Sequence, residues 1–323
     1  MAELGLGTMN FGRTGWGCDA TVADRLVARF LDAGGRHVDT ADVYGDGASE
    51  EILGRALAGR RDTVCLCTKA GWPTGGPTDR GTRARYLPRA LEASLTRLRT
   101  DHVDLFYAHV WDEGTPVEET AAALSALVRA GKARAIGVCN HTGWQLGEVT
   151  AAVHAAGGRL GWLQTLHALT TRDVEWDSLV VARRRGMRVV AWGALASGLL
   201  TGKYATPAAP PGARLCVDAK TPRTLRARVW TARNLALVEV VVAEARTLGW
   251  PPTRVALAWS LAHPALDVVL AGPRDGLQLD QAIEARAAVL PPATRDRLDR
   301  ASEPAVPFPH DEAAAVASVL RDD

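Results

Sequence analysis

The sequence predicts an α/β protein built as a single (β/α)8 barrel, the fold known as a TIM barrel. Short apolar runs with the pattern of β-strands alternate with amphipathic runs that have the pattern of helices, and eight such repeats follow one another. Strands that alternate with helices form a parallel sheet, and eight repeats in about 300 residues are typical of a closed barrel. No low-complexity stretch marks a boundary, so we expect residues 1–323 to form one domain with a C-terminal extension after about residue 291.

The composition argues against several classes of function. Hydrophobic residues make up 47% of the chain and charged residues 23%, and the net charge of +2 gives no reason to expect a nucleic-acid or membrane partner. The N-terminus lacks a signal-peptide pattern, and no apolar run is long enough to span a bilayer. The cysteines form no CxxC pair and the histidines no HExxH motif. We therefore expect reduced thiols, a cytoplasmic protein and no metal site, while the oligomeric state is left open.

The boundaries of the elements follow from the hydrophobic periodicity and from Gly and Pro. The predicted strands are the run that ends at Val38 and residues 4–9, 63–71, 103–109, 133–140, 160–165, 187–192 and 267–272. The predicted helices are residues 21–33, 48–57, 87–98, 116–130, 143–156, 174–185, 225–248, 253–262 and 277–289. The Gly-, Pro- and Ala-rich segment 194–223 is long enough to be an active-site loop.

The third predicted strand carries Cys65, Cys67 and Lys69 at alternate positions. Side chains two residues apart in a strand share a face. If Lys69 points to the mouth of the barrel, both thiols point into the barrel interior. We therefore interpret the two cysteines as buried core residues rather than reactive thiols.

Four polar residues lie at predicted strand ends or in the loops that follow them: Asp39, Tyr44, Lys69 and His109. The ends of strands two, three and four meet at one mouth of a barrel, so these side chains are expected close together. Taken singly, each has an ordinary interpretation. An Asp after a strand is usually a turn or cap residue, a Lys is usually solvated, and a His is usually structural. Their combination favours a catalytic site.

The stretch GGRHVDTADVYGDGASEEILGRAL at residues 34–57 resembles the signature of the aldo-keto reductases, with its pattern of DTAxxYG, SE and LG. The resemblance covers roughly residues 3–290 and is closest to the bacterial, NADPH-dependent branch that also contains the potassium-channel β-subunits. It implies a (β/α)8 barrel whose catalytic tetrad corresponds to the four residues above, each in its motif. Most members carry a β-hairpin ahead of the first strand, and we expect this barrel to lack it, because the chain enters directly with ELGLGTMNFG.

The resemblance also assigns roles to the tetrad. Reduction of a carbonyl needs a hydride donor and a proton donor at the oxygen. A tyrosine with an ordinary pKa near 10 is a poor acid at neutral pH, and a nearby ammonium group lowers that pKa. By resemblance Tyr44 is the general acid and Lys69 lowers its pKa. Asp39 would hold Lys69 in place, and His109 would orient the carbonyl oxygen.

The hydride would come from NADPH. Asn140 and Gln164 are suited to pair with the nicotinamide carboxamide, and Trp192 offers a face for stacking, although a lone Trp at a strand end is more often a core residue. Cys139 replaces the serine of the family and weakens one hydrogen bond. No GxGxxG motif follows a strand, which argues against a Rossmann domain. The resemblance places further cofactor contacts after strands seven and eight, at Gly193, Leu195, Gly198, Lys203, Gly272, Arg274 and Gln278.

Arg274 is placed to pair with a 2′-phosphate, which favours NADPH over NADH. Ala282 replaces an asparagine of the family, so one adenine contact is expected to be lost, and His167 stands where a tyrosine is common. Three tryptophans in predicted loops are candidates for substrate contacts: Trp16, Trp72 and Trp111. An aromatic mouth suits a flat, cyclic or sugar-like substrate, and loop anchoring is an equally good interpretation.

The resemblance therefore predicts an NADPH-dependent reductase of an aldehyde or ketone. An alternative is an NADPH-binding regulatory subunit with little turnover, as some potassium-channel β-subunits with this fold keep the tetrad. A third hypothesis is a barrel enzyme that acts on a phosphorylated substrate through Arg274, in which the tetrad would have no obvious role. Binding of a dinucleotide separates the third hypothesis from the first two, and turnover separates the first from the second.

Overall fold

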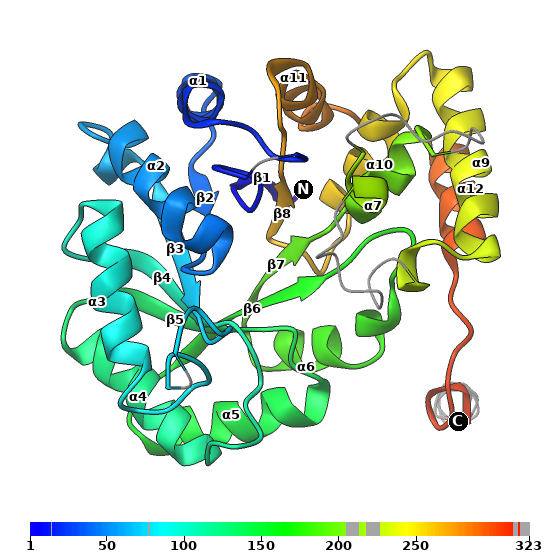
Figure 1. Cartoon of the computed structure of the whole chain (residues 1–323). Coiled ribbons are helices and arrows are strands. Elements are labelled where there is room, and N and C mark those ends of the chain that lie inside the picture. Colours follow the sequence, from blue (N-terminus) through cyan, green and yellow to red (C-terminus); the bar gives the residue numbers. More distant parts are fainter. Residues whose placement is uncertain (14, 77, 205–212, 218–226, 313–315, 317–323) are drawn as a thin grey trace.

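The computed structural model describes residues 1–323 except 14, 77, 205–212, 218–226, 313–315 and 317–323 (Figure 1). Its parallel strands form a closed barrel in the order β1 to β8, and β8 pairs with β1. The strands are β1 Glu3–Gly7, β2 His37–Asp39, β3 Cys65–Ala70, β4 Val103–Ala108, β5 Ala133–Cys139, β6 Leu160–Leu166, β7 Arg188–Trp192 and β8 Val268–Ala271. The predicted (β/α)8 barrel is confirmed.

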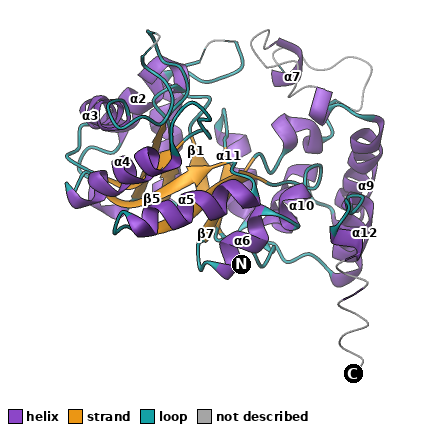
Figure 2. Ribbon diagram, turned by 90° about the horizontal axis from the view of Figure 1, so that it is seen from below, coloured by secondary structure: helices purple, strands orange, loops and turns teal. Residues whose placement is uncertain are grey.

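Helices cover the outside of the barrel (Figures 1 and 2). They are α1 Ala20–Asp32, α2 Ala48–Ala56, α3 Leu87–Leu98, α4 Val117–Arg129, α5 Gly143–Ala155, α6 Ser178–Arg184, α7 Arg214–Val217, α9 Ala232–Leu248, α10 Pro252–Leu261, α11 Gly276–Ala285 and α12 Pro292–Ser302. Short 3-10 turns are η1 Tyr44–Gly47, η2 Arg61–Thr63, η3 Asp173–Glu175 and η4 Ala196–Thr201. Most of the α-helices lie where the hydrophobic periodicity of the sequence predicts a helix.

Two predicted helices differ from the structure. The segment 174–185 divides into η3 and the shorter α6, because Asp177 has non-helical backbone angles (φ −120°, ψ −94°) and its carboxylate accepts a hydrogen bond from the N–H of Gly143 at 2.7 Å. The helix predicted from residue 225 is interrupted after residues 227–229, and α9 begins at Ala232, where the hydroxyl of Thr231 accepts the N–H of Asn234. Residues 225–226 lie outside the described part of the chain, as do 205–212 and 218–223 of the predicted active-site loop.

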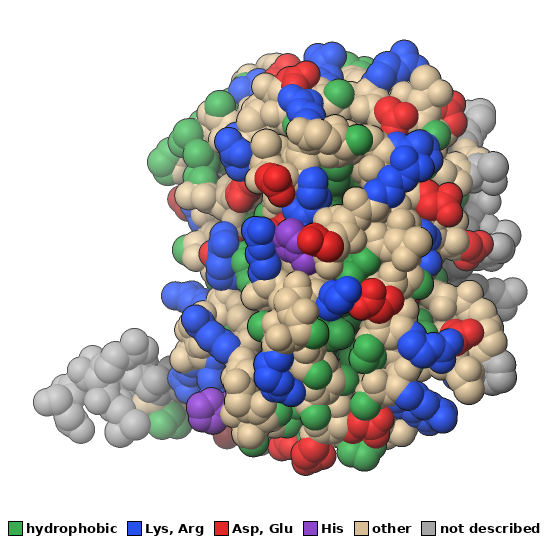
Figure 3. Space-filling view, turned by 90° about the vertical axis from the view of Figure 1, so that its left-hand side faces the viewer, with side chains coloured by type: hydrophobic (Ala, Val, Ile, Leu, Met, Phe, Trp, Pro, Cys, Tyr) green, Lys and Arg blue, Asp and Glu red, His purple; other side chains and the backbone are tan. Residues whose placement is uncertain are grey.

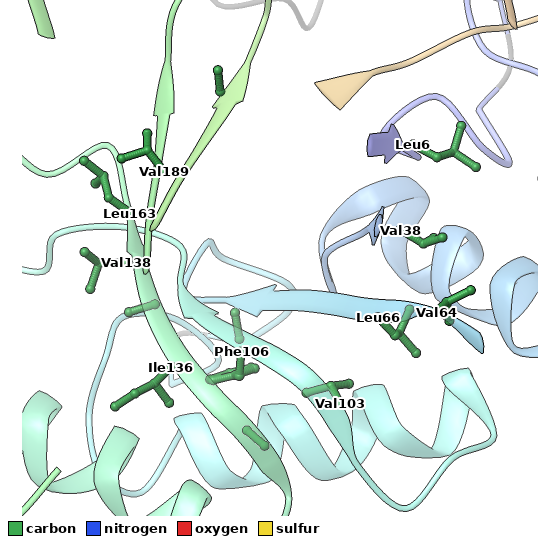
Figure 4. Close-up of a cluster of buried hydrophobic side chains, with 14 of the residues drawn as sticks. Leu6, Val38, Val64, Leu66, Val103, Phe106, Ile136, Val138, Leu163 and Val189 are labelled. Atoms are coloured by element: carbon green, nitrogen blue, oxygen red, sulfur yellow. The ribbon is translucent and has the colours of Figure 1, made fainter. Parts of the chain in front are cut away.

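The barrel has two layers of apolar packing. Side chains on the outer face of the strands pack against the helices, and the labelled residues of Figure 4, such as Leu66, Phe106 and Ile136, belong to this layer. Side chains on the inner face fill the barrel and include Cys67, Tyr107 and others: Leu105, Cys139, Val190, Val268 and Leu270. The prediction that Cys65 and Cys67 face the interior is thereby confirmed.

The segment after residue 291 packs against the body of the protein through α12, which lies alongside α9 in both ribbon views (Figures 1 and 2). Arg297 of α12 donates two hydrogen bonds to Glu244 of α9, at 2.5 and 2.8 Å. Leu298 is fully buried beside them. Two contacts of different kinds, one charged and one apolar, therefore hold this extension in place.

One face of the molecule mixes the two signs of charge. Lys and Arg side chains alternate with Asp and Glu over the face shown in Figure 3. Within the described residues, none of the helices combines the length and apolar character needed to cross a membrane.

Candidate active site

A buried ion pair joins β2 to β3 at the mouth of the barrel. Nζ of Lys69 lies 2.5 Å from Oδ1 of Asp39, and both side chains are almost completely buried. The same ammonium donates to the backbone carbonyl of Thr40 at 2.6 Å. Burial alone would lower the pKa of Lys69, but the charge of Asp39 overcomes this and raises it. Lys69 therefore stays charged at neutral pH.

Tyr44 begins η1, and its hydroxyl lies 3.4 Å from Nζ of Lys69, which is at the long end of hydrogen-bonding distance. The phenol ring remains partly exposed. Burial of the hydroxyl raises the pKa of Tyr44 above its ordinary value of 10, and the Lys69 ammonium opposes that rise. The Lys69 ammonium lowers the pKa of Tyr44, as expected, but desolvation outweighs this attraction and the net shift is upward. Tyr44 is a proton donor at neutral pH.

His109 follows β4 directly, and its ring lies edge-on to Tyr44, with 6.0 Å between the ring centroids. Its backbone N–H continues the β3–β4 ladder by donating to the carbonyl of Ala70 at 2.9 Å. Burial, and to a lesser degree the charge of Lys69, hold the pKa of His109 well below 6.5. The imidazole is therefore neutral, with one N–H that can donate and one nitrogen that can accept.

The loop that carries Tyr44 has an unusual backbone. Gly45, Asp46 and Gly47 follow one another in the left-handed region, with φ of 61°, 55° and 94°. A side chain at Gly47 would come within 2.9 Å of Arg97, so this position needs glycine for space as well as for conformation. The tight reversal turns the chain from Tyr44 directly into α2.

The Ser49 and Glu50 side chains, at the start of α2, fasten that helix to the barrel. The Ser49 hydroxyl lies within 2.9 Å of the carbonyl and within 2.8 Å of the hydroxyl of Thr8 in the β1 loop. Glu50 is fully buried and accepts hydrogen bonds from Thr68 at 2.5 Å and from Arg97 at 2.7 Å. The SE pair of the sequence pattern therefore positions the Tyr44 loop and takes no direct part in the tetrad.

Two amide side chains, one in β6 and one directly after β5, have defined orientations. Gln164 of β6 donates through Nε2 to Oδ2 of Asp39 at 2.8 Å, and Oδ1 of Asn140 accepts the indole N–H of Trp192 at 2.9 Å. A carboxylate can only accept a hydrogen bond and an indole N–H can only donate one, so the oxygen and nitrogen positions of both amide groups are fixed. Gln164 then presents its oxygen and Asn140 its amide nitrogen to a ligand. One acceptor and one donor are what a carboxamide group requires.

Cys139 lies in the barrel interior beside this group. Its side chain is buried, and burial raises the pKa of the thiol while the Lys69 ammonium opposes the rise. Cys139 is therefore a neutral thiol that offers only a weak hydrogen bond. The prediction that it weakens one corner of a carboxamide site stays a prediction.

The segment after β7 contains the predicted phosphate-loop residues. Gly193 has φ of 78°, and in η4 Ser197 and Gly198 are left-handed, with φ of 58° and 90°. A side chain at Gly198 would lie 2.8 Å from Nζ of Lys203, so the glycine lets the ammonium lie close to the backbone. Leu195 precedes η4 and packs partly buried against the core.

Arginines gather around Trp16 near the end of β8. The guanidinium groups of Arg13 and Arg214 lie 5.2 and 4.6 Å from the centre of the Trp16 ring, within the range of a cation–π contact. Nη1 of Arg274 donates to the carbonyl of Trp16 at 3.3 Å. Among the described residues, Nε of Arg13 is buried without a hydrogen-bond partner. The structure therefore groups Trp16 with the predicted adenosine-phosphate residues rather than with the tetrad.

The other predicted residues at this end have structural contacts. Oε1 of Gln278 accepts the N–H of Arg274 at 3.1 Å, and Asp275 caps α11. Gly272 is exposed directly after β8. Ala282 is buried in the core, so its methyl group does not supply a polar contact.

Aromatic side chains surround the loops after β3, β4 and β5. Trp72 is half exposed and lies edge-on to His109 at 6.2 Å. Trp111 packs edge-on against His141 at 5.4 Å and against Trp144 at 5.3 Å. Trp144, which the sequence analysis did not select, is the most exposed of the three tryptophans. Its place at the second position of α5, next to a strand end, was the signal that could have identified it.

Comparison with known proteins adds to this geometry. The profile of the Aldo/keto reductase family matches residues 3–303. The human aflatoxin B1 aldehyde reductase member 2 is 36% identical over 313 residues, which cover 92% of this chain and 85% of the relative. An Escherichia coli O157:H7 L-glyceraldehyde 3-phosphate reductase is 33% identical over 287 residues, covering 85% and 81%. A probable voltage-gated potassium channel subunit beta of Oryza sativa subsp. japonica is 31% identical over 290 residues, covering 87% of both chains.

Proposed function

Because this chain belongs to the Aldo/keto reductase family and is an oxidoreductase of that family, we propose that it uses NADPH to reduce an aldehyde or a ketone to the alcohol. The observation that carries the proposal is the buried Asp39–Lys69 pair, whose ammonium lies 3.4 Å from the hydroxyl of Tyr44. A buried ion pair is costly to desolvate and does not by itself indicate added stability. The position of this ion pair next to the phenol of Tyr44 supports a chemical role.

NADPH, when bound, supplies the hydride. Tyr44 donates its proton to the carbonyl oxygen as negative charge develops there, and burial keeps the phenol protonated until that moment. Lys69 stabilises the phenolate that remains, because two opposite charges attract strongly where water is excluded. His109 is neutral and donates its one N–H toward the same oxygen without bringing a charge that would compete with Lys69.

The chain offers a consistent set of groups for the cofactor. Asn140 presents an amide nitrogen and Gln164 an amide oxygen, which together complement the carboxamide of nicotinamide. Trp192 is held in orientation by Asn140 and offers a face to the nicotinamide ring. Lys203 and the left-handed turn at Gly198 suit the pyrophosphate. Arg274, with the neighbouring arginines around Trp16, suits the 2′-phosphate that distinguishes NADPH from NADH.

The substrate proposed is a flat or cyclic carbonyl compound. Trp72 lies against His109, and Trp111 and Trp144 form a second aromatic surface beside it. Aromatic faces bind planar rings through offset or edge-on contacts. A sugar-like carbonyl, which can place C–H groups on the same faces, is the other member of this class.

Replacement of Tyr44 by Phe tests the catalytic assignment. The ring remains and the transferable proton is lost, so kcat should fall by at least about 100-fold, the lower range for a general acid. NADPH binding, followed by quenching of tryptophan fluorescence, should change little. The control is Tyr107→Phe, which removes a buried hydroxyl without a partner among the described residues. Equal loss of activity in both variants would contradict the role of Tyr44.

Replacement of Arg274 by Ala tests the cofactor assignment. Loss of a charge-assisted contact worth about 1.5–3 kcal/mol should raise the Kd for NADPH by about 10- to 100-fold, with a much smaller effect on NADH. Arg134→Ala is a control at the start of β5, where the arginine is 65% exposed and pairs with Asp104. Equal effects of Arg274→Ala on the two cofactors would refute the 2′-phosphate assignment.

A second function is suggested by the similarity to a potassium channel subunit beta. In that case the chain would bind NADPH and act mainly through a protein partner. Tight NADPH binding with negligible turnover over a broad panel of aldehydes and ketones, together with co-purification of a channel protein, would favour it. Measurable turnover that Tyr44→Phe removes would favour the reductase.

A further inference from the structure

Three potential metal ligands meet in the barrel interior toward the N-terminal ends of the strands. They are His37, which begins β2, and Cys65 and Cys67 of β3, and their ligand atoms all lie within 4.8 Å of one another. We propose that these three side chains form a zinc site. It lies below the Lys69 ion pair, on the side of the barrel away from the mouth, and it serves neither the cofactor nor the carbonyl substrate.

The distances between the ligand atoms support a tetrahedral ion. Zinc binds sulfur at about 2.3 Å and imidazole nitrogen at about 2.0–2.1 Å, so two tetrahedral sulfurs lie about 3.8 Å apart and a sulfur and a nitrogen about 3.5 Å apart. The two thiol sulfurs are separated by 3.9 Å, and Sγ of Cys67 is 3.4 Å from Nε2 of His37. Two of the three distances between ligand atoms therefore already have the length that zinc requires. Rotation of the half-buried Cys65 side chain can adjust the third.

The ligand types select a metal of this kind. Thiolate sulfur and imidazole nitrogen favour zinc over magnesium and calcium, which prefer oxygen. In the complex both sulfurs are thiolates and His37 is neutral, so the dication and two thiolates give a complex without net charge. A neutral complex suits this position, since His37 and Cys67 are buried and an uncompensated charge there would be costly.

The surroundings of the three ligands offer a path for entry. Cys65 and Trp162 are only partly buried, so this end of the barrel is not sealed. The ring of Trp162 is tilted 6.2 Å from that of His37, and Arg188 lies 4.3 Å above the centre of the indole. Three protein ligands with an open position for water are a coordination that zinc commonly adopts.

A second group of possible ligands, in the described part of the chain, fits a metal less well. It consists of His167, Glu175 and His263. Arg172 already donates to both oxygens of Glu175, at 2.8 and 2.9 Å, so that carboxylate has its counter-charge. By contrast, the described partners of the Cys67 sulfur are the Cys65 thiol, the Cys65 carbonyl and His37.

The sequence predicts no metal site because metal-binding motifs are recognised by the spacing of their ligands along the chain. Here the ligands come from two adjacent strands, and the pairing of His37 with Cys65 in the β2–β3 register brings them together. The same alternation that turns Lys69 to the mouth turns both thiols inward.

Metal titration of the reduced, metal-free protein tests the proposal. One Zn²⁺ or Co²⁺ should bind per chain, and cobalt should give a thiolate-to-metal charge-transfer band and the visible bands of a tetrahedral ion. Zinc should release protons and raise the Tm. Cys65→Ser and His37→Gln should each weaken binding by more than about 100-fold, beyond the 10- to 100-fold typical of an outer-shell partner. Circular dichroism checks that each variant is folded.

The control is Cys18→Ser, which removes a buried thiol outside the cluster and should leave zinc affinity unchanged. Absence of binding to the folded, reduced protein would overturn the proposal, as would equal affinity in Cys65→Ser. A Cys65–Cys67 disulfide in anaerobically isolated protein would overturn it in favour of a redox pair. None of these readouts needs NADPH or a carbonyl substrate, so the outcome is independent of the proposed reductase activity.

Discussion

Asp42 is a buried acid directly beneath the loop that carries Tyr44, and its replacement by Asn should change how stability depends on pH. The side chain is 5% exposed. Tyr86 donates to Oδ2 at 3.3 Å, and Oδ1 has no partner among the described residues. Burial, followed by the charge of Glu50, raises the pKa of Asp42 to about 7, and Arg97 only partly opposes this. The carboxylate is therefore disfavoured in the folded protein.

The sign and size of the effect follow from linkage. A pKa raised from 3.8 to about 7 is about 3 units at 1.36 kcal/mol each, which gives about 4 kcal/mol as an upper limit. Between these two pH values the folded state binds more protons at this site than the unfolded state, so the contribution of Asp42 to stability falls as the pH rises. It is largest below about pH 4 and is lost as the pH rises through about 7. An amide at this position does not titrate.

The assay is urea unfolding of wild type and Asp42→Asn from about pH 5 to about pH 8. Other titrating groups are common to both proteins, so the difference between the two free energies isolates Asp42. That difference should move in favour of the variant as the pH rises, by up to about 2.5 kcal/mol over this pH range. The same Asp-to-Asn change at Asp46, which is exposed on the same loop, is the matched control. A difference that stays constant with pH would refute the reasoning.

Two further predictions concern the catalytic pair and the aromatic mouth. Lys69→Met leaves the Asp39 carboxylate buried without its ammonium partner, so it should lower the free energy of unfolding by about 3–5 kcal/mol and abolish reduction, as measured by urea unfolding and NADPH oxidation. Near-normal stability would show that Asp39 is compensated elsewhere. Trp144→Ala removes an exposed ring that contacts Trp111 and should raise the KM for aromatic aldehydes about 2- to 10-fold without changing kcat. A small aliphatic aldehyde is the control substrate, and an equal change in its KM would contradict a stacking role.

The sequence predicts the barrel well because the hydrophobic periodicity agrees with the positions of the Gly and Pro residues that bound the elements over most of its length. The helix predicted at residues 87–98 matches α3 Leu87–Leu98, and the alternation in β3 correctly places Lys69 and the two thiols on one face. The errors occur where a tertiary contact overrides local pattern. Asp177 interrupts a periodic segment to cap the chain at Gly143, which no local signal in residues 174–185 indicates.

The site could be predicted where it depends on strand ends and not where it depends on contacts between loops. Asp39, Tyr44, Lys69 and His109 each follow or end a strand, so the fold brings them together. The arginines around Trp16 come from segments far apart in the sequence, as Arg13 and Arg214 do, and periodicity carries no information about such contacts. The pKa of Tyr44 depends on the depth of burial, which only the packed structure supplies.

The interior face of β3 places the proposed zinc ligands and the catalytic ammonium on consecutive inward positions. Cys67 is one such position below Lys69, so any charge on the sulfur acts on the ammonium across a medium that screens it weakly. Zinc with two thiolates and a neutral imidazole has no net charge. The occupied site therefore adds no net charge beside the Asp39–Lys69 pair. For this reason a zinc site can stabilise this end of the barrel without setting the reactivity of Tyr44.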